Sequence, residues 1–331
     1  MTVADIVVQT EHLAREASTW LAGRCKLIVC AYDDPTFADV LAGAAGLVVR
    51  TYTEVDEKLL RAGTKLRVVG RAGAGLDNID LGACRVRGIE VVYTPDANTQ
   101  AVVEYVVGLL ADVLRPKITL STPVDRGQWK QLRAETLGRR QMSELTLGIL
   151  GLGRVGKRLA EVARAIGCRV LFNDLLEIPP GQRFGAEPAP VDRLFAQSDV
   201  VSIHIDGRAS NQHFVGAELL GRMKSDVILI NTSRGFVVDS VALAAFLREH
   251  PQAQALLDVH DREPFDAAYP LLGLPNARLY PHLASRTERA MLNMSWVVKD
   301  VAAVLEGREP QFPAPSDEST ADEDSESQNP S

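Results

Sequence analysis

Residues 148 to 174 read "GILGLGRVGKRLAEVARAIGCRVLFND", and this stretch decides the fold. A short apolar run ends in a glycine-rich turn, and a helical pattern follows from about Arg154 to Ile166. Gly167 can end that helix, and a second apolar run then leads to Asp174. The order predicts a strand, a helix and a second strand that lies parallel to the first.

The glycines of this stretch also have the spacing of a phosphate-binding turn. Gly151, Gly153 and Gly156 form the pattern G-x-G-x-x-G, and Asp174 comes about twenty residues after the pattern begins. Glycines let a pyrophosphate approach the backbone, and the helix N-terminus offers N–H donors and a partial positive charge. Asp174 would bind the adenosine ribose and repel a 2′-phosphate. We therefore predict a dinucleotide site that takes NAD, the alternative being a tight strand–helix turn without a ligand.

The same alternation of apolar runs and helical patterns extends over most of the chain. Eleven runs read as strands: residues 5–9, 26–31, 46–50, 66–73, 89–95, 145–150, 169–174, 199–205, 226–235, 255–260 and 277–283. They fall into two sets, which predicts an α/β protein with two doubly wound parallel-sheet domains. Between the sets, a long apolar helix is expected from Asn98 or Thr99 to Arg115, followed by a polar, Arg-rich arm over residues 117–144.

Composition excludes several classes of protein. The 331 residues carry a formal net charge of -7, but the last sixteen hold six acids and no base, which leaves 37 acids and 36 bases elsewhere. A nearly neutral body gives no electrostatic footprint for nucleic acid. Four scattered cysteines indicate neither a metal site nor a disulfide framework. We expect no signal peptide and no membrane span, and hence a cytoplasmic protein whose residues 313–331 form a disordered acidic tail.

Five motifs, in order along the chain, resemble those of the D-isomer-specific 2-hydroxyacid dehydrogenase family. They are "VGRAGAGLDNIDL" from Val69, "GLGRVG" from Gly151, "INTSRGFVVD" from Ile230, "LDVHDREPF" from Leu257 and "PHLAS" from Pro281. The likeness runs from about residue 46 to residue 310. It implies a Rossmann NAD-binding domain, residues 99–283, inserted into a flavodoxin-like substrate-binding domain made of residues 1–98 and 284–312.

The resemblance also implies a site. Arg234, Glu263 and His282 match the catalytic positions of the family. This set suits the reduction of a 2-keto acid, because a histidine can donate the proton, a carboxylate can favour its charged form, and an arginine can clamp the substrate carboxylate. The implied cofactor-binding residues are Gly151, Gly153, Arg154, Val155, Gly156, Asp174, Ile205, Asp206, Thr232, Ser233, Arg234, Asp258 and His282. The implied substrate-binding residues are Arg50, Arg71, Gly73, Ala74, Gly75 and Arg234, and no metal is expected.

Some residues near these motifs have a less specific interpretation. His260 and Asp261, beside Glu263, are expected to be solvated turn residues. His204, in the run 199–205, has either a structural role or, at most, a contact with the cofactor. The family often has Tyr-Asp-Pro where this chain has Asn173-Asp174-Leu175, and a proline where Asp206 stands. Both departures concern the adenosine end of the cofactor.

Within the family, the best likeness is to the D-3-phosphoglycerate dehydrogenase branch, in a short form without regulatory domains. Arg50 and Arg71 lie where that branch uses basic side chains for the distal phosphate. A glyoxylate or hydroxypyruvate reductase is the first alternative. A scaffold like the C-terminal-binding-protein corepressors, which use NAD without relying on turnover, is the second. The helix over residues 101–115 is apolar on more than one face, which predicts a homodimer formed through the cofactor domains.

Overall fold

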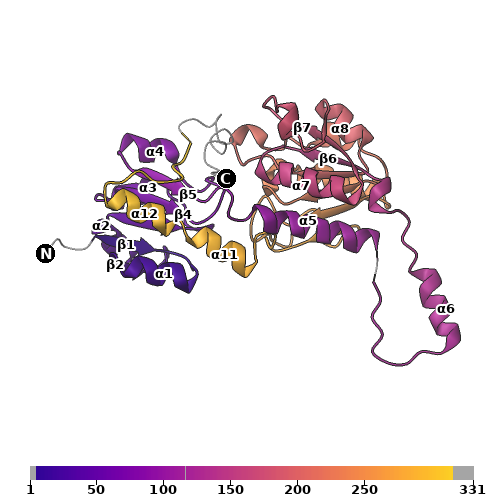
Figure 1. Ribbon diagram of the computed structural model, residues 1–331, viewed down its shortest axis with the longest axis horizontal. Coiled ribbons are helices and arrows are strands. Elements are labelled where there is room, and N and C mark those ends of the chain that lie inside the picture. Colours follow the sequence, from indigo (N-terminus) through magenta and orange to yellow (C-terminus); the bar gives the residue numbers. More distant parts are fainter. Residues whose placement is uncertain (1–4, 116, 316–331) are drawn as a thin grey trace. The chain divides into compact units, whose positions relative to one another are not determined.

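The computed structural model describes residues 5–115 and 117–315, which form two compact units. The discontinuous unit comprises residues 5–98 and 285–315, and the central unit comprises residues 99–284 without its undescribed residue 116. Both units are layered α/β structures with a wholly parallel sheet, so the expected fold class is confirmed (Figure 1).

The discontinuous unit has five strands in the order β2-β1-β3-β4-β5, which is the flavodoxin-like order. The last two helices of the chain, α11 and α12, belong to this unit, and α12 packs on β3, β4 and β5 (Figure 1). Its elements are β1 (Ile6–Gln9), α1 (Arg15–Ala22), β2 (Lys26–Val29), α2 (Phe37–Ala42), β3 (Gly46–Val49), α3 (Glu57–Ala62), β4 (Val68–Arg71), α4 (Leu81–Val86), β5 (Glu90–Tyr93), α11 (Glu288–Ser295) and α12 (Val298–Leu305).

The central unit has seven strands in the order β12-β11-β10-β9-β6-β7-β8, which is the Rossmann order with one added strand. Its strands are β6 (Thr146–Leu150), β7 (Arg169–Asn173), β8 (Glu187–Pro188), β9 (Val200–Ile203), β10 (Ile228–Asn231), β11 (Gln254–Leu257) and β12 (Ala277–Leu279). Its helices are α5 (Thr99–Leu114), α6 (Arg126–Glu135), α7 (Arg154–Ile166), α8 (Val191–Gln197), α9 (Ala217–Leu220) and α10 (Ser240–Glu249), with 3-10 turns η1 (Met142–Glu144), η2 (Pro180–Gln182), η3 (Ala209–Asn211) and η4 (Gly235–Val237).

Two apolar clusters cover the two faces of the central sheet. Ile149 belongs to one cluster and its neighbour Leu150 to the other, because successive strand residues point to opposite faces. The first cluster includes α5 and α7, which lie side by side (Figure 1). Burial on both faces explains why the strands read as continuous apolar runs in the sequence.

The structure departs from the sequence expectations in several places. One is the short strand β8, which was not expected. Residues 126–135 of the supposedly irregular arm form helix α6, which contains no buried residue. Pro313 and Ala314 pair with β5, so the start of the expected tail is ordered along this strand. Residues 316–331 of the tail lie outside the described residues. Ala284, expected in the other domain, packs in the core of the central unit.

Candidate active site

The strand order of the central unit reverses between β6 and β9, and in such sheets ligands bind at the carboxyl ends of the strands beside that reversal. The glycine turn lies there. Gly151 has a φ of 94°, and a Cβ on it would lie 2.8 Å from the carbonyl carbon of His204. Only glycine accommodates this left-handed backbone so close to the loop after β9. Helix α7 then begins at Arg154, and its N-cap Gly153 provides no side-chain cap.

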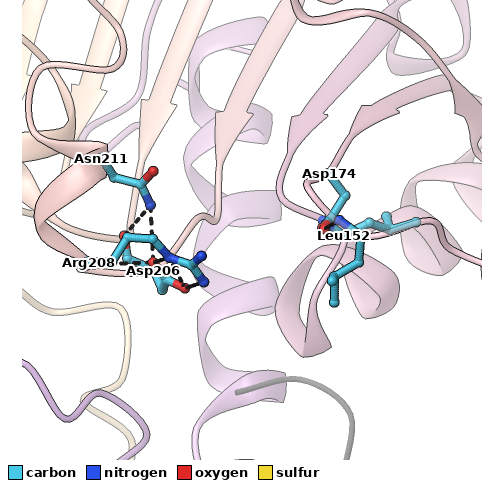
Figure 2. A network of polar contacts seen from close by, with 6 residues as sticks. Leu152, Asp174, Asp206, Arg208 and Asn211 are labelled. Carbon is cyan, nitrogen blue, oxygen red and sulfur yellow. Dashed lines mark hydrogen bonds and ion pairs between the residues drawn. The ribbon is translucent and has the colours of Figure 1, made fainter. Parts of the chain in front are cut away.

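Asp174 lies beside this turn, at the end of β7. Its Oδ2 accepts a hydrogen bond of 2.5 Å from the backbone nitrogen of Leu152, and its Oδ1 accepts one of 2.9 Å from Leu176 (Figure 2). The Asp174 carboxylate therefore supports the glycine turn. It also lies at the position where the sequence predicts a residue that binds the adenosine ribose. This site fits the adenosine diphosphate part of a dinucleotide. It combines the uncapped start of α7, the tight turn at Gly151 and the carboxylate of Asp174.

Asp206 belongs to a compact polar network after β9, on the other side of β6 from Asp174. Its Oδ1 accepts a hydrogen bond from Nε of Arg208 at 2.7 Å, and Nη2 of Arg208 binds the second oxygen. Asn211 donates to the main-chain oxygen of Asp206 at 3.0 Å and to its Oδ1 at 3.1 Å (Figure 2). Asp206 thus carries a charge that Arg208 balances, in place of the proline that the family pattern led us to expect.

His204 precedes this network and directly borders the glycine turn. Its Nε2 lies 2.8 Å from the hydroxyl oxygen of Ser202. Burial lowers the pKa of His204 to about 4, so the ring is neutral at physiological pH. A neutral ring and a backbone packed on Gly151 indicate that His204 supports the turn.

The Thr232–Arg234 turn follows β10. Asn231 holds it, because its Nδ2 donates to the main-chain oxygen of Arg234 at 2.9 Å and its Oδ1 accepts from the backbone nitrogen of Ser233 at 3.0 Å. Among the described residues, no group hydrogen-bonds with the buried hydroxyl of Thr232. An unpartnered buried hydroxyl at the carboxyl edge of the sheet fits a polar ligand, such as a nicotinamide carboxamide, better than a closed structural turn.

His282 and Glu263 form a pair. Nδ1 of His282 lies 2.8 Å from Oε2 of Glu263, and Oε1 of Glu263 accepts from the backbone nitrogen of His260 at 2.9 Å. Burial by itself raises the pKa of Glu263, but hydrogen bonding to His282, the positive charge on that ring and the bond from His260 outweigh burial and hold the pKa below 4.5. Because a carboxylate can only accept, Nδ1 carries a proton and Nε2 is the nitrogen that remains for a substrate.

The backbone at His282 is held in an unusual conformation. Its φ is 54°, in the left-handed region that non-glycine residues rarely occupy, and its nitrogen donates to the main-chain oxygen of Asp258 at 2.9 Å. Such outliers persist where the surroundings over-determine them, and they concentrate at functional sites.

Asp258 builds the loop behind the histidine. It is fully buried, and its two carboxylate oxygens accept hydrogen bonds of 2.8 Å from the backbone nitrogens of Leu283 and Ala284. Tyr105 also hydrogen-bonds to Asp258, and burial together with this carboxylate raises the pKa of the tyrosine well above its ordinary value. These contacts give Asp258 a structural role that the sequence did not reveal, and its contact with a cofactor stays a prediction.

His260 was expected to be a solvated turn residue, and that expectation is wrong. Its exposed fraction is only 6%, whereas the neighbouring Asp261 is exposed as expected. Burial along the strand-like run extends past Val259 to His260. The His260 ring can be buried because it hydrogen-bonds with two groups inside the unit.

The expected substrate-binding residues of the discontinuous unit follow β3 and β4. A Cβ on Gly73 would lie 1.5 Å from Nη1 of Arg71, so the guanidinium of Arg71 lies against the Gly73–Gly75 loop, as a shared anion site requires. Arg50 is different: it is 9% exposed and donates to the main-chain oxygen of His12 at 3.2 Å and to the sulfur of Met291 at 3.2 Å. Burial lowers the pKa of Arg50. These contacts suit a structural role, and Arg71 is the better candidate for a distal phosphate.

Comparison with known proteins agrees with this geometry. Residues 107–284 match the model of the D-isomer specific 2-hydroxyacid dehydrogenase, NAD binding domain. The chain therefore belongs to the D-isomer specific 2-hydroxyacid dehydrogenase family, and its central unit is a nicotinamide-cofactor domain. Within the described residues, no helix is long and apolar enough to cross a membrane, and no cluster of potential metal ligands occurs.

Three of the curated relatives illustrate how their names differ. A D-3-phosphoglycerate dehydrogenase of Archaeoglobus fulgidus is 33% identical over 79% of this chain and 49% of its own length. An (S)-sulfolactate dehydrogenase of Chromohalobacter salexigens is 37% identical, covering 78% of this chain and 84% of its own. A glyoxylate reductase of Aeropyrum pernix is 33% identical, covering 84% and 86%. The chain spans about half the length of the phosphoglycerate dehydrogenases it matches.

Solved structures share the fold over nearly the whole chain. A glyoxylate reductase from Paecilomyes thermophila superimposes with a TM-score of 0.81 at 27% identity, covering 95% of this chain and 99% of its own. A D-lactate dehydrogenase from Aquifex aeolicus, complexed with NAD and lactic acid, gives 0.78 at 25% identity, covering 92% and 96%.

Proposed function

We propose that the protein is an NAD-dependent D-2-hydroxyacid dehydrogenase that interconverts a 2-hydroxy acid and its 2-keto acid. The observation that carries the proposal is the His282–Glu263 pair, joined at 2.8 Å within the nicotinamide-cofactor unit. The three names found among the relatives all describe oxidoreductases of small 2-hydroxy or 2-keto acids.

In this proposal each catalytic residue has one task. The bound cofactor supplies or accepts the hydride. During reduction, Nε2 of His282 delivers a proton to the oxygen of the former carbonyl group, and Glu263 remains a carboxylate that stabilises the imidazolium. Arg234 binds the substrate carboxylate and polarises the carbonyl. Because Glu263 and the backbone contacts of Asp258 already fix the histidine ring, little reorganisation is needed at the moment of proton transfer.

NAD is the proposed cofactor, with Gly151, Gly153 and Gly156 at the pyrophosphate and Asp174 at the adenosine ribose. The remaining cofactor contacts are proposed from Arg154, Val155, Ile205, Asp206, Thr232, Ser233, Arg234, Asp258 and His282. Arg208 is the cation nearest to Asp206 along this loop, but it already forms an ion pair with that acid. The charge of Asp174 supports discrimination against the additional phosphate of NADP.

The proposed substrate is 3-phosphoglycerate, oxidised to 3-phosphohydroxypyruvate. Support comes from the relatives named for it and from the contact of Arg71 with the loop of Gly73, Ala74 and Gly75. A guanidinium at this loop can bind the carboxylate or the phosphate of a small acid. Glyoxylate or hydroxypyruvate is the alternative, favoured by the relatives named as reductases.

We also propose a homodimer. The arm, residues 117–144, supports it better than α5 does, since most apolar residues of α5 are buried within the central unit. Trp129 and Leu137 of the arm are 50% and 80% exposed, and Ile118 and Leu120 are about half exposed. Apolar side chains gathered on one polar arm are typical of a segment that packs on another subunit.

Steady-state kinetics with a panel of acids tests the proposal. Oxidation of 3-phosphoglycerate and D-glycerate with NAD, and reduction of glyoxylate, hydroxypyruvate and pyruvate with NADH, would be compared by kcat/KM. Turnover that His282→Asn abolishes supports the proposal. NADH binding without turnover of any acid would instead support the scaffold alternative.

A further inference from the structure

His260 stands at the junction of the segments that carry the proposed catalytic residues. Its Nε2 lies 2.9 Å from the main-chain oxygen of Tyr280, which can only accept, so Nε2 carries the proton. Nδ1 lies 3.1 Å from the hydroxyl of Tyr269, which can donate or accept. The ring is therefore held between two fixed partners.

The hydrogen bonds of His260 connect it to both sides of the His282–Glu263 pair. The backbone nitrogen of His260 donates to Oε1 of Glu263 at 2.9 Å, and Oε2 of the same carboxylate pairs with Nδ1 of His282 at 2.8 Å. The ring of His260 binds Tyr280, two residues before His282. His260 thus holds the Glu263 carboxylate through its backbone nitrogen, and it holds the segment that leads to His282 through its side chain.

The third segment meets His260 through its backbone. A Cβ on Gly235 would lie 1.8 Å from the carbonyl carbon of His260 and 2.3 Å from the nitrogen of Asp261. The turn that carries Arg234 is therefore packed directly on the His260–Asp261 peptide. A shift of this peptide would disturb the positions of Arg234 and Glu263 together.

Aromatic packing keeps the His260 ring in place. The ring centroid lies 4.7 Å from that of Phe265 and 5.4 Å from that of Tyr269, and Phe265 stacks on Tyr269 at 4.8 Å. Burial raises the pKa of Tyr269 to about 12, with the charges of Asp261 and Glu263 adding to the effect. The hydroxyl of Tyr269 consequently keeps its proton at any pH where the protein would work.

We propose that His260 is a positioning residue that holds Glu263 and His282 in the geometry needed for proton transfer. The proposal rests on the proposed function in one respect only, that these two residues form the acid–base pair. His260 itself does not touch the substrate. Its effect reaches the reaction through the Glu263 carboxylate and through the Tyr280–His282 segment.

Two variants separate the hydrogen bond from the packing. His260→Phe keeps a ring against Phe265 and Tyr269 but removes the donor to Tyr280, whereas His260→Gln keeps a donor at a similar position without the ring. His250→Phe is the matched control, since His250 also packs on a phenylalanine, Phe246 at 4.5 Å, but lies at the end of α10 outside the pair.

Loss of one hydrogen bond that aligns the pair should lower kcat of His260→Phe about three- to tenfold, with a smaller change in KM. The alkaline limb of the pH profile for reduction should also move to lower pH, since a loosened Glu263 stabilises the imidazolium less. Among the charged or titratable groups around the pair, which include Asp258, Asp261 and Tyr269, the variant alters only His260 itself. His260→Gln should recover part of the kcat, and His250→Phe should behave like the parent.

Nuclear magnetic resonance titration of the His282 ring in the free protein gives a readout that does not depend on turnover. His260→Phe should shift the His282 titration to lower pH, and His250→Phe should not. A folded His260→Phe variant with parental kcat and parental His282 titration would overturn the proposal, as would a lower Tm with no other change. If the parent turns over no acid, the proposed function fails, and the titration still decides the role of His260.

Discussion

Leu152 and Asp174, 22 residues apart in the chain, are joined by a hydrogen bond of 2.5 Å from a backbone nitrogen to a carboxylate oxygen. Asp174 is expected to select the cofactor, and through this hydrogen bond it also supports the glycine turn that would bind the cofactor. Charge and support are therefore two separate contributions of Asp174, and two variants can distinguish them.

The parent should prefer NAD over NADP by roughly tenfold or more in kcat/KM, since the Asp174 carboxylate repels a 2′-phosphate. Asp174→Asn removes the charge but keeps an acceptor for Leu152, so it should narrow the preference mainly by improving NADP. Asp174→Ala also loosens the turn and should weaken both cofactors. Steady-state kinetics with NAD and NADP measures the preference, and fluorescence titration with NADH and NADPH measures the affinities. Equal kcat/KM for the two cofactors in the parent would refute the assignment.

Replacing His282 by Asn should lower kcat about 10²- to 10⁴-fold, the usual loss when a general acid is removed. Cofactor affinity should change much less, because the asparagine leaves the glycine turn and Asp174 intact. A stopped-flow measurement of the hydride-transfer step, paired with NADH titration, separates the two effects. Substantial residual kcat with normal NADH binding would show that another group supplies the proton.

Glu263→Gln removes the charge that stabilises the imidazolium form of His282. Reduction requires that form, so the alkaline limb of its pH profile should move to lower pH. The pKa of Glu263 is held below 4.5 in the folded protein, so its carboxylate adds stability above pH 4.5 that is lost as pH falls through the lowered value. The Tm difference between parent and variant should accordingly shrink in acid. An unmoved alkaline limb would exclude Glu263 as the partner.

Arg71→Ala should reduce kcat/KM for 3-phosphoglycerate by about one to two powers of ten and leave D-glycerate and glyoxylate nearly unchanged, as expected for a charge-assisted phosphate contact. Arg50→Ala is the comparison, because Arg50 is bound to His12 and Met291 inside its unit. That variant should lower Tm and affect all substrates alike. A uniform loss in Arg71→Ala would favour glyoxylate or hydroxypyruvate as the substrate.

The protein should be a dimer by multi-angle light scattering at micromolar concentration. Trp129→Lys with Leu137→Glu places charges on the exposed apolar side chains of the arm, and should shift the mass toward a monomer because charged residues are depleted from interface cores. Lys130→Glu serves as a control on the same helix. A monomeric parent, or an unaffected double variant, would contradict the assignment of the arm.

The sequence predicted those features that depend on local spacing. The strand–turn–helix around Gly151, the helix over residues 99–114 and the two parallel sheets follow from apolar periodicity and glycine positions, and the structure confirms them. Helix α6 was missed because its residues have no apolar stripe. Its local signal was nevertheless present, since Asp125 and Gln128 form a capping box at its start.

The errors share a different cause, which is contact between segments far apart in the chain. His260 looks like part of a charged turn, and only the carbonyl of Tyr280 and the hydroxyl of Tyr269 make its burial favourable. The structural contacts of Arg50, which the sequence marks only as a candidate for the substrate phosphate, were missed for the same reason, because its guanidinium reaches Met291, 241 residues later in the chain. Contacts between residues far apart in the chain cannot be predicted from local apolar periodicity.

The return of the chain to its first sheet sets the order in which the two units can be completed on the ribosome. Strands β1 to β5 are synthesised early, yet helix α12, which packs on three of them, ends at Leu305. The central unit is one continuous segment and is fully synthesised first. At roughly 5–20 residues per second, the last residue of the central unit is synthesised only about one to four seconds before Leu305. Strands β1 to β5, in contrast, wait for α12 while the whole central unit is synthesised. During this longer wait, the face of the first sheet that α12 later covers is open to chaperones and to other nascent chains.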